Sequence, residues 1–521
     1  MTTRITGAVS GLDTDSLVKS EMQPLQTKLD TLNQTKQTVT WQRDAYKEMN
    51  AKILDFRNNK LTTFKTDTVL RARKAEVTGD TDAVKVTTNG GAATGSMTIK
   101  AMQLATGAAL KSSNSIVKSG STLDTKSTLT SQQAKLQGGS SMQSTYTFSV
   151  NGTSITVDTA KDSLSDVISR INKQTNVTAY YDSGTGNMSF TSKDAGDTSK
   201  VEITNDSKDF FKNILQTDTS TDTATNTQYS KGQNAIVEIN GIKTTRTSNT
   251  FTENGINVTL NKVSELTDST QAGSTDPQYY QASTITVTPD SDSIVSAIKD
   301  FVTQYNDVLK TLEDKVDETR YRDYKPLTSD QQEAMNETQI NQWNEKAMSG
   351  LLRNDSILTS AVNKMRNAAS SIVGTGSKYN TLASIGITAG DYTEKGKLYV
   401  DEDKLKAAIE ANPDSVADIF SQKASSTSTN VTDNGFATRM YDDLYNTMKD
   451  LSTRAGTSAF SASTLKSDST LGKQLSNLET QIDDQEDKMN DYEDRLYLKY
   501  SRMESALSTL QSQSSALTSL K

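Results

Sequence analysis

The stretch from Leu471 to Leu520 constrains the fold more than any other part of the sequence, because its seam residues recur at alternating steps of four and three. A repeat of about 3.5 residues marks an α-helix whose apolar seam faces another helix along its length. At 1.5 Å per residue this helix would be a rod of roughly 75 Å, so it needs a long partner rather than a compact core. The predicted seam consists of Leu471, Leu475, Leu478, Ile482, Gln485, Met489, Tyr492, Leu496, Lys499, Met503, Ala506, Leu510, Gln513, Leu517 and Leu520.

Three of these seam positions are polar: Gln485, Lys499 and Gln513, which follow one another at intervals of two heptads. Polar seam residues lower the stability of a coiled coil and set its register or oligomeric state. Two interpretations remain open from the pattern. The rod forms a helical hairpin with the chain's own N-terminal region, or it also packs into an assembly of several subunits.

The N-terminal region offers the matching seam. Asp13 or Thr14 is expected to cap a helix, and Leu25, Leu29 and Leu32 begin its apolar stripe. The row that starts at Leu29 continues at steps of seven with the polar residues Lys36, Arg43 and Asn50. Apolar residues form a paired row again after Tyr46. We interpret the thin part, about residues 35–40, as a joint between a leg and a body; a slightly irregular surface helix is the alternative.

From about Ala75 the hydrophobic period changes to two, which indicates strands. Asn-Gly pairs between alternating runs predict hairpins at Asn89-Gly90-Gly91, Asn151-Gly152, Asn240-Gly241 and Asn254-Gly255. A turn at Gly184 and Gly186 predicts another hairpin, and Ser163 is expected to cap a short helix that starts at Leu164. Residues 106–144 are poor in large apolar side chains and are predicted to be irregular.

Helical spacing returns after Asp290, with helices expected from Ile294 to Val316 and from Ile357 to Ile372, while Tyr321–Glu333 is expected to be a charged loop. The predicted fold class is therefore α+β and multidomain, with a terminal antiparallel coiled-coil leg, a helical-bundle body and two inserted β-rich domains. The expected domains are a leg helix, 1–42, that pairs with 470–521; a helical body, 43–75 and 290–469; a first β-rich domain, 76–107 and 232–289; and a second β-rich domain, 108–231.

Composition argues against several classes of function. The chain has neither histidine nor cysteine, which removes disulfides, thiol nucleophiles and the usual zinc ligands. No cofactor, metal site or catalytic residue is predicted, and an enzyme is not expected. A net charge of −8 does not indicate a nucleic-acid partner. The N-terminus lacks the apolar segment of a secretory signal, and no apolar run is long enough to insert into a membrane.

Other motifs are weaker. Gly390–Leu398 imitates a phosphate-binding loop, but one residue too many separates its glycines and Leu398 stands where Ser or Thr is needed. The acidic clusters Asp401–Asp403 and Asp483–Asp487 lack the spacing of a calcium loop. The first is better explained as a helix N-terminus, and the second as a solvated helix face.

Four segments resemble the filament cap family of the bacterial flagellum, the hook-associated protein 2 family. Ser10–Val18 is similar to the family's N-terminal motif, and Ile385–Phe420 to its C-terminal segment. Leu164–Ser192 is similar to an insertion motif of flagellin-related proteins, and Ile236–Val263 to the family's β domain. Together these four segments contain about a fifth of the residues of the chain.

The resemblance implies a structural protein of the flagellum that acts in motility and filament assembly. It implies a homo-oligomeric ring at the filament tip, which promotes the folding and insertion of exported flagellin and prevents its loss. Implied partners are flagellin, the hook–filament junction proteins and an export chaperone at the C-terminal helix. The family is exported by the flagellar type III apparatus, so the resemblance implies an extracellular location without a cleaved signal peptide.

Two alternatives accompany this assignment. One is a sibling axial protein, a flagellin or a junction subunit, against which the Ile385–Phe420 segment argues. The other is a surface adhesin that acts in cell adhesion through host glycans bound by its β domains. Such a role predicts a concave aromatic pocket, for which the pairs Tyr180-Tyr181 and Tyr279-Tyr280 are the candidates.

Overall fold

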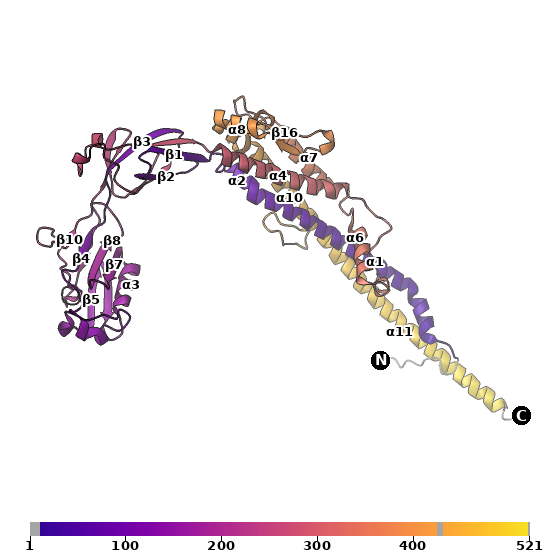
Figure 1. The fold of residues 1–521 in the computed structure, drawn as a ribbon. Coiled ribbons are helices and arrows are strands. Elements are labelled where there is room, and N and C mark those ends of the chain that lie inside the picture. Colours follow the sequence, from indigo (N-terminus) through magenta and orange to yellow (C-terminus); the bar gives the residue numbers. More distant parts are fainter. Residues whose placement is uncertain (1–10, 425–430, 519–521) are drawn as a thin grey trace. The chain divides into compact units, whose positions relative to one another are not determined.

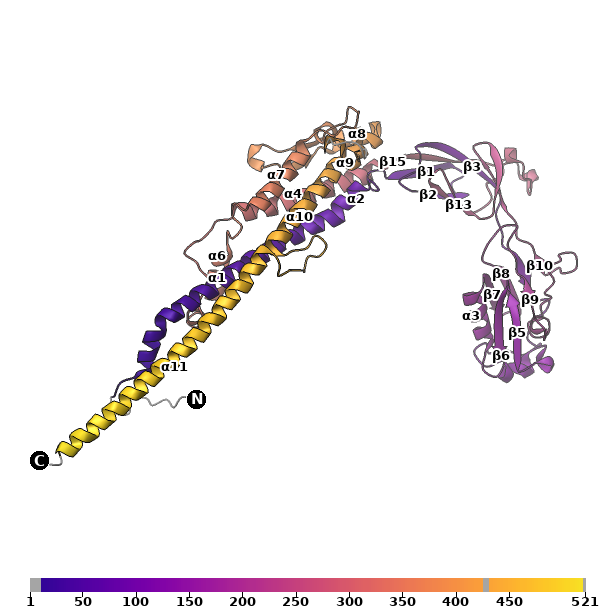
Figure 2. The same cartoon turned by 180° about the vertical axis from the view of Figure 1, so that it is seen from behind.

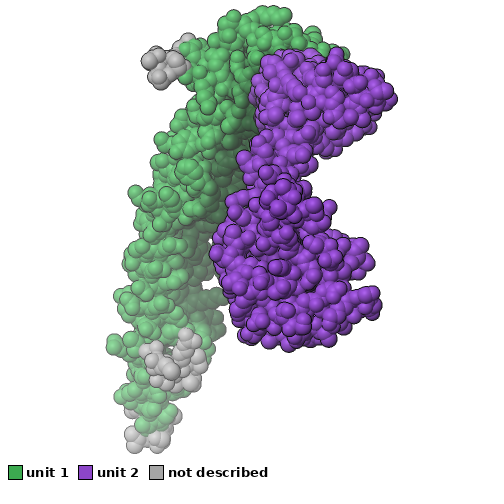
Figure 3. Space-filling model, turned by 90° about the vertical axis from the view of Figure 1, so that its left-hand side faces the viewer, with its two compact units in different colours: residues 1–71, 291–521 green, residues 72–290 purple. Residues whose placement is uncertain are grey.

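The computed structural model describes residues 11–424 and 431–518. The chain divides into two compact units, which Figure 3 colours separately. Unit 1 combines the chain up to Arg71 with the chain from Ser291 onward, and unit 2 comprises Ala72–Asp290. Unit 2 is thus an insertion into unit 1. The predicted α+β, multidomain class is confirmed, whereas the finer domain boundaries stay predictions.

Unit 1 is mostly helical. Its longest elements are α1 (Thr14–Phe56) and α11 (Thr470–Thr518), and a π-helical turn (Arg57–Leu61) leads from α1 into α2 (Thr62–Lys65). The other helices are α4 (Ser291–Asp317), α5 (Ser329–Glu333), α6 (Glu337–Met348), α7 (Ser356–Ser370), α8 (Glu402–Ala411), α9 (Pro413–Ser421) and α10 (Phe436–Ala455). A short hairpin joins β16 (Ile387–Ala389) to β17 (Leu398–Val400). No helix among the described residues is long and apolar enough to cross a membrane.

Aromatic side chains fill the centre of unit 1. The Phe64 ring lies 4.5 Å from that of Phe301 and 5.4 Å from that of Phe420, and Phe436 packs edge-on against Phe301. These residues come from α2, α4, α9 and α10, and all of them are buried. Their burial supplies much of the apolar area that holds the two sequence halves of the unit together.

Helix boundaries follow the expected caps. The Ser16 amide donates to the Asp13 carboxylate, so Asp13 is the N-cap of α1. The Lys404 amide donates to Asp401, which begins α8, and Pro413 occupies the first turn of α9, where its missing N–H costs nothing. The prediction that Tyr321–Glu333 is a loop was partly wrong, because Thr328 and Gln331 form a capping box that starts α5.

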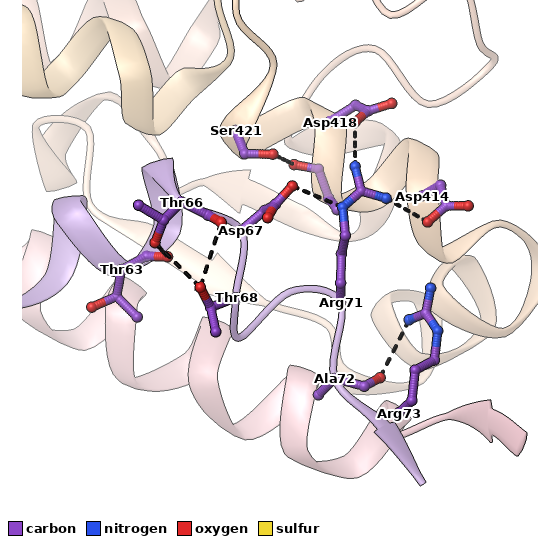
Figure 4. Close-up of polar contacts among 11 residues, drawn as sticks. Thr63, Thr66, Asp67, Thr68, Arg71, Ala72, Arg73, Asp414, Asp418 and Ser421 are labelled. Carbon is purple, nitrogen blue, oxygen red and sulfur yellow. Dashed lines mark hydrogen bonds and ion pairs between the residues drawn. The ribbon is translucent and has the colours of Figure 1, made fainter. Parts of the chain in front are cut away.

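Arg71, the last residue of unit 1, lies where the chain leaves the helical body (Figure 4). Its Nε is 2.7 Å from Asp67, and its two terminal nitrogens reach Asp414 at 2.5 Å and Asp418 at 3.0 Å on α9. Burial raises the pKa of Asp418, while the Arg71 guanidinium opposes that shift. A fork of donors in one plane suits three carboxylates better than an ammonium does.

Unit 2 contains four main sheets. One part pairs the strands in the order β1-β15-β3-β11-β12 and, in a second sheet, β13-β14-β2. Their bounds are β1 (Arg73–Gly79), β2 (Val84–Thr88), β3 (Gly95–Gln103), β11 (Ala235–Ile239), β12 (Ile242–Arg246), β13 (Thr250–Glu253), β14 (Ile256–Leu260) and β15 (Ser283–Pro289). These strands share one hydrophobic core.

The other part of unit 2 has its own core. Its strands pair in the orders β10-β4-β8-β7 and β6-β5-β9, and α3 (Leu164–Gln174) packs on β7. Their bounds are β4 (Ala109–Lys111), β5 (Thr145–Val150), β6 (Thr153–Asp158), β7 (Val177–Asp182), β8 (Asn187–Ser192), β9 (Ile203–Thr204) and β10 (Tyr229–Ser230). The predicted cap of α3 is confirmed as a capping box between Ser163 and Asp166.

Three of the predicted Asn-Gly hairpins are confirmed: β5–β6, β11–β12 and β13–β14. In each turn both residues have positive φ, for example 48° at Asn151 and 84° at Gly152. This is the type I′ geometry, whose twist matches that of the flanking strands. The β7–β8 hairpin at Gly184 and Gly186 is also confirmed.

The hairpin predicted at Asn89-Gly90-Gly91 was wrong. β2 pairs with β14, whereas β3 pairs with β15 and β11. The Asn89 amide instead donates to the Gly255 carbonyl, so the turn packs on the β13–β14 turn and carries the chain from one sheet to another. Strands that are neighbours in sequence here belong to different sheets, which local pattern alone does not reveal.

Residues 106–144 are more ordered than the sequence suggested. They contain β4 and two 3₁₀ turns, Thr130–Lys135 and Gly139–Ser141. Ile116, Leu129 and Leu136 are buried in the core of this part of unit 2. A few well-spaced apolar residues therefore anchor a segment whose other side chains are small and polar.

Replacing Arg71 by Met should destabilise unit 1 by about 1–3 kcal/mol, because it leaves three carboxylates together without their shared donor. Thermal or urea unfolding followed by circular dichroism measures the loss. Lys310→Met is the matched control. It removes an exposed pair with Asp314 on one helix and should change stability by less than about 0.5 kcal/mol. Equal effects of the two substitutions would contradict a special role for the Arg71 fork.

Candidate functional site: the paired terminal helices

The first half of α1 and the helix α11 run side by side in both ribbon views (Figures 1 and 2). The contacts between them are antiparallel. Lys36 on α1 lies 3.1 Å from Glu479, the Leu25 carbonyl accepts from Gln485 Nε2 at 3.2 Å, and Glu21 accepts from the Tyr500 hydroxyl at 2.6 Å. As residue numbers fall along α1, they rise along α11. The termini of the chain therefore share one helical leg.

The structure places the predicted α11 seam in three environments. The buried members are Leu471, Leu478, Ile482, Gln485 and Leu496. The half-buried members are Leu475, Met489, Tyr492 and Met503. The exposed members are Lys499, Ala506, Leu510 and Gln513. The side chain of Leu517, and Leu520 altogether, lie outside the described residues. The contribution of these residues to assembly stays a prediction.

Lys499 is exposed because the contact line drifts. An α-helix with 3.6 residues per turn rotates by about 20° per heptad against a 3.5-residue repeat, unless the helices supercoil. From Leu471 to Lys499 the drift sums to roughly 80°, close to the angle between adjacent residues of a helix. Figure 1 shows α11 as a nearly straight rod. The residue that faces α1 is accordingly Tyr500, which is buried.

On α1 the predicted seam is more open. Leu25, Leu29 and Leu32 are half-buried. None of the residues 19–38, all of which the structure describes, is buried. Pro24 lies inside this stretch. Proline lacks the N–H for the preceding turn, and its ring crowds the carbonyl four residues earlier, which bends a helix. Both ribbon views show α1 bending in this region.

Gln485 is the polar seam residue that the structure buries, with 2 % of its surface exposed. Its amide donates to a backbone carbonyl, Leu25 O, which already belongs to the α1 helix. A buried amide is costly without such a partner. Because the acceptor lies at one place on α1, the bond favours one register of the two helices over its neighbours.

On the N-terminal side of Pro24, a second set of contacts joins the start of α1 to α11. We call this set the tyrosine clasp, defined by Asp15, Val18 and Glu21 of α1 with Tyr497 and Tyr500 of α11. Val18 packs with Leu496 and Tyr500 in a small apolar cluster. The Tyr497 hydroxyl donates to Asp15 at 3.0 Å, and Lys499 lies 3.4 Å from Glu21.

Sequence reasoning missed the clasp, since Tyr497 and Tyr500 are off the strict heptad. The available signal was the pairing of acids near the start of α1 with tyrosines near the end of α11. The Tyr500 hydroxyl holds the pKa of the Glu21 carboxyl below its usual range, and Glu21 in turn raises the pKa of Tyr500.

The thin part of the α1 seam, about residues 35–40, has another neighbour. Gln34 Nε2 donates to the Pro326 carbonyl at 2.7 Å, and Trp343 Nε1 donates to the Lys325 carbonyl at 2.7 Å. The Trp343 and Tyr324 rings pack 4.6 Å apart. The connection from α4 to α7 thus contacts α1 here, which explains why α1 carries amides rather than leucines at this place.

The tyrosine pairs considered for a glycan pocket do not share one environment. Tyr180 is exposed on β7, whereas Tyr280 is buried. Tyr181 lines a shallow cavity of about 420 Å³ beside small hydroxyl residues and glycines. No aromatic cradle built from both pairs is present among the described residues.

Comparison with known proteins covers nearly the whole chain. Residues 232–512 match the family model described as the flagellar hook-associated protein 2 C-terminus, and residues 10–108 match that of its N-terminus. Residues 147–194 match the flagellin hook IN motif.

Individual relatives agree with these matches. Flagellar hook-associated protein 2 of Halalkalibacterium halodurans is 29 % identical over 496 residues, which cover 87 % of this chain and 88 % of the relative. The protein of that name from Salmonella typhimurium is 30 % identical over 215 residues, 41 % of this chain and 38 % of the relative. The crystal structure of the D1-D2-D3 domains of the flagellar cap protein FliD from Escherichia coli superposes with a TM-score of 0.52 at 21 % identity, covering 84 % of this chain and 99 % of that one.

Acid should loosen the tyrosine clasp. Because the folded state lowers the pKa of Glu21, its contribution is fully present above the unfolded-state pKa and is lost as the pH falls through the folded-state pKa. Hydrogen exchange of the amides in residues 14–24, corrected for intrinsic rates, should show less protection in acid. Glu21→Gln should lower the protection at neutral pH and flatten this pH dependence.

Asp13 belongs to the same segment, and the Ser16 hydroxyl and amide lower the pKa of its carboxyl too. The matched control is therefore Asp13→Asn, which keeps the cap but removes its charge. An acid response that Asp13→Asn abolishes and Glu21→Gln leaves intact would assign the effect to the cap and contradict the clasp.

Proposed function

This chain belongs to the flagellar hook-associated protein 2 family, the family of flagellar filament caps, and we propose that it closes the distal end of the filament as a ring of identical subunits. The observation that carries this proposal is the leg formed by α1 and α11. A long, thin helical pair is suited to lie among the helices of a filament end, whereas a globular domain is not.

In the proposed cap the leg holds the filament and yields as each new flagellin subunit inserts. Three features of the leg support such a step. The Gln485 amide favours one register through a single hydrogen bond, and the α1 seam has no buried residue from 19 to 38. The clasp relies on the exposed Asp15 and the half-buried Glu21. Contacts that are numerous and individually weak exchange more readily than a continuous apolar zipper does.

The proposal includes the partners that the family implies. Flagellin is the subunit that folds and inserts beneath the cap, and the hook–filament junction proteins are the first surface on which the cap sits. The C-terminal part of α11, which includes the exposed Leu510 and Gln513, is the proposed site for an export chaperone before secretion by the flagellar type III apparatus. The location is then the filament tip outside the cell.

Negative-stain imaging of the purified full chain tests the ring. Closed rings with protruding legs are expected. Long filaments would favour a sibling axial protein, and monomers at every concentration tested would contradict the proposed cap. Restoring filament growth in cells that lack their own copy is the functional measurement.

A second prediction concerns the polar seam. Replacing Gln485, Lys499 and Gln513 together by Leu should stabilise the leg at the buried Gln485 and add apolar side chains at the exposed Lys499 and Gln513. We expect slower filament growth at the tip, because the leg then holds one arrangement too firmly. The readout is filament length over time with labelled flagellin. The matched control places three leucines at exposed positions of the same helix that are outside the predicted seam, Asp484, Arg502 and Ser512. Growth that is normal in the first variant would refute the stepping argument.

A further inference from the structure

Phe460 protrudes from the connection between α10 and α11, with 80 % of its surface exposed. Its neighbours in sequence are small, Ser458, Ala459, Ser461 and Ala462. Its ring touches that of Tyr445, with the centroids 6.4 Å apart. A phenylalanine has no polar atom to keep in water, so this exposed ring is able to pack into an apolar cavity of another molecule.

A cavity of about 570 Å³ lies elsewhere on unit 1, between α4, α7 and the turn that joins β16 to β17. Val316, Val362, Ala389 and Tyr392 supply much of its apolar lining. Ion pairs between Arg366 and Glu313 and between Lys395 and Asp317 border it. Its size is in the range of pockets that receive a ring-sized group.

The cavity is preformed. Arg366 Nε donates to the Lys395 carbonyl at 2.8 Å, which ties the β16–β17 turn to α7. Gly396 has a φ of 88°, and a Cβ at this position would meet the Arg366 side chain at 2.9 Å. The glycine-bearing stretch that imitates a phosphate loop in sequence is therefore the wall of this cavity, where it connects two strands rather than a strand and a helix.

The charges around the two features are complementary. Near Phe460, Arg43 donates to the Ala455 and Lys466 carbonyls, and Arg57 stacks on Tyr441 and Tyr445. Within the described part of the chain neither guanidinium has a carboxylate partner. At the cavity, Asp391 forms no ion pair with a described residue, although its carboxylate accepts a hydrogen bond from the Thr393 hydroxyl within the turn. Arg57 is buried, so the half-buried Arg43 supplies the positive charge on this side of the unit, and the exposed Asp391 supplies negative charge at the cavity.

We propose that Phe460 of one copy of this chain inserts into the α4–α7 cavity of the next copy. Because the two surfaces differ, the contact is head-to-tail, the type that closes into a ring or grows into a helix. Both ribbon views place the α10–α11 connection and β16 on opposite sides of α4 and α10 (Figures 1 and 2). Each copy of the chain therefore presents the Phe460 side chain to one neighbouring copy and the α4–α7 cavity to the other. The inference rests on the proposed ring, and it assigns residues to the contact within that ring.

The absence of cysteine from the sequence permits a direct test. Two single variants are prepared with tags of different size, one Ala462→Cys, an exposed residue two positions from an intact Phe460, and the other Asn363→Cys, an exposed residue that lines the cavity. After mixing and mild oxidation, a mixed disulfide between the two proteins is expected to exceed either homodimer several-fold. Ile372→Cys, at an exposed position outside the cavity lining, replaces Asn363→Cys in the control and should give little mixed product.

Sedimentation velocity of the full chain supplies the second readout. Phe460→Ser should weaken self-association at least tenfold, without lowering the midpoint of thermal unfolding, because the side chain is exposed. Added salt should weaken the association of the unaltered chain. If the unaltered chain associates, Phe460→Ser associates equally well and no mixed disulfide forms, the inference is overturned and the proposed ring stands. If the unaltered chain does not associate at all, both fail.

Discussion

The pairing of α1 with α11 is governed by the mismatch between a heptad repeat in the sequence and the natural turn of an α-helix. Over the first heptads of α11 the predicted seam and the contact line coincide, so Leu471, Leu478 and Ile482 are buried. Because α11 stays nearly straight, the contact line leaves the heptad before its end and passes to Tyr500. The end of the leg is therefore held by tyrosine–carboxylate hydrogen bonds as well as by apolar packing. The chemistry of the clasp is a consequence of helix geometry.

The same constraint divides the leg into zones of different stability. In the C-terminal half of α1, the side chains of Val39, Tyr46 and Ile53 are buried in the helical body. The Tyr46 hydroxyl also donates to the Asp355 carboxylate, which caps α7. At the far end the clasp holds α1 near Val18. Between them lies a stretch without a buried side chain that also contains Pro24. A helix with few buried apolar contacts opens locally at a lower free energy than the core does, so we expect local opening of the leg to begin in this stretch.

The sequence predicted those parts of the fold that local periodicity controls. It predicted the two long helices, the caps at Asp13, Ser163 and Asp401, and three type I′ hairpins, because each depends on residues close together in the chain. It failed at Asn89-Gly90-Gly91, where strand partners come from residues 256–260 and 283–287. Sheet membership is a property of distant segments, and one sequence does not contain that signal. Tyr497 and Tyr500 were missed for a different reason, since a strict heptad assumes a supercoil that α11 lacks.

Residues that seemed to weaken the helical pattern have the clearest roles in unit 1. The polar stretch of α1 near Gln34 faces the backbone carbonyl of Pro326, so leucine at this place would leave polar main-chain groups without a partner. In the leg, the Gln485 side chain donates to the Leu25 carbonyl and thereby favours one register of α1 against α11. The glycines of the β16–β17 turn, whose spacing imitates a phosphate-binding loop, shape a wall of the cavity against α7. In each case a polar side chain or a turn makes a contact that an apolar side chain could not make. In the proposed cap, which grips a helical assembly and moves along it, such departures are useful because a uniform seam has no preferred point of release.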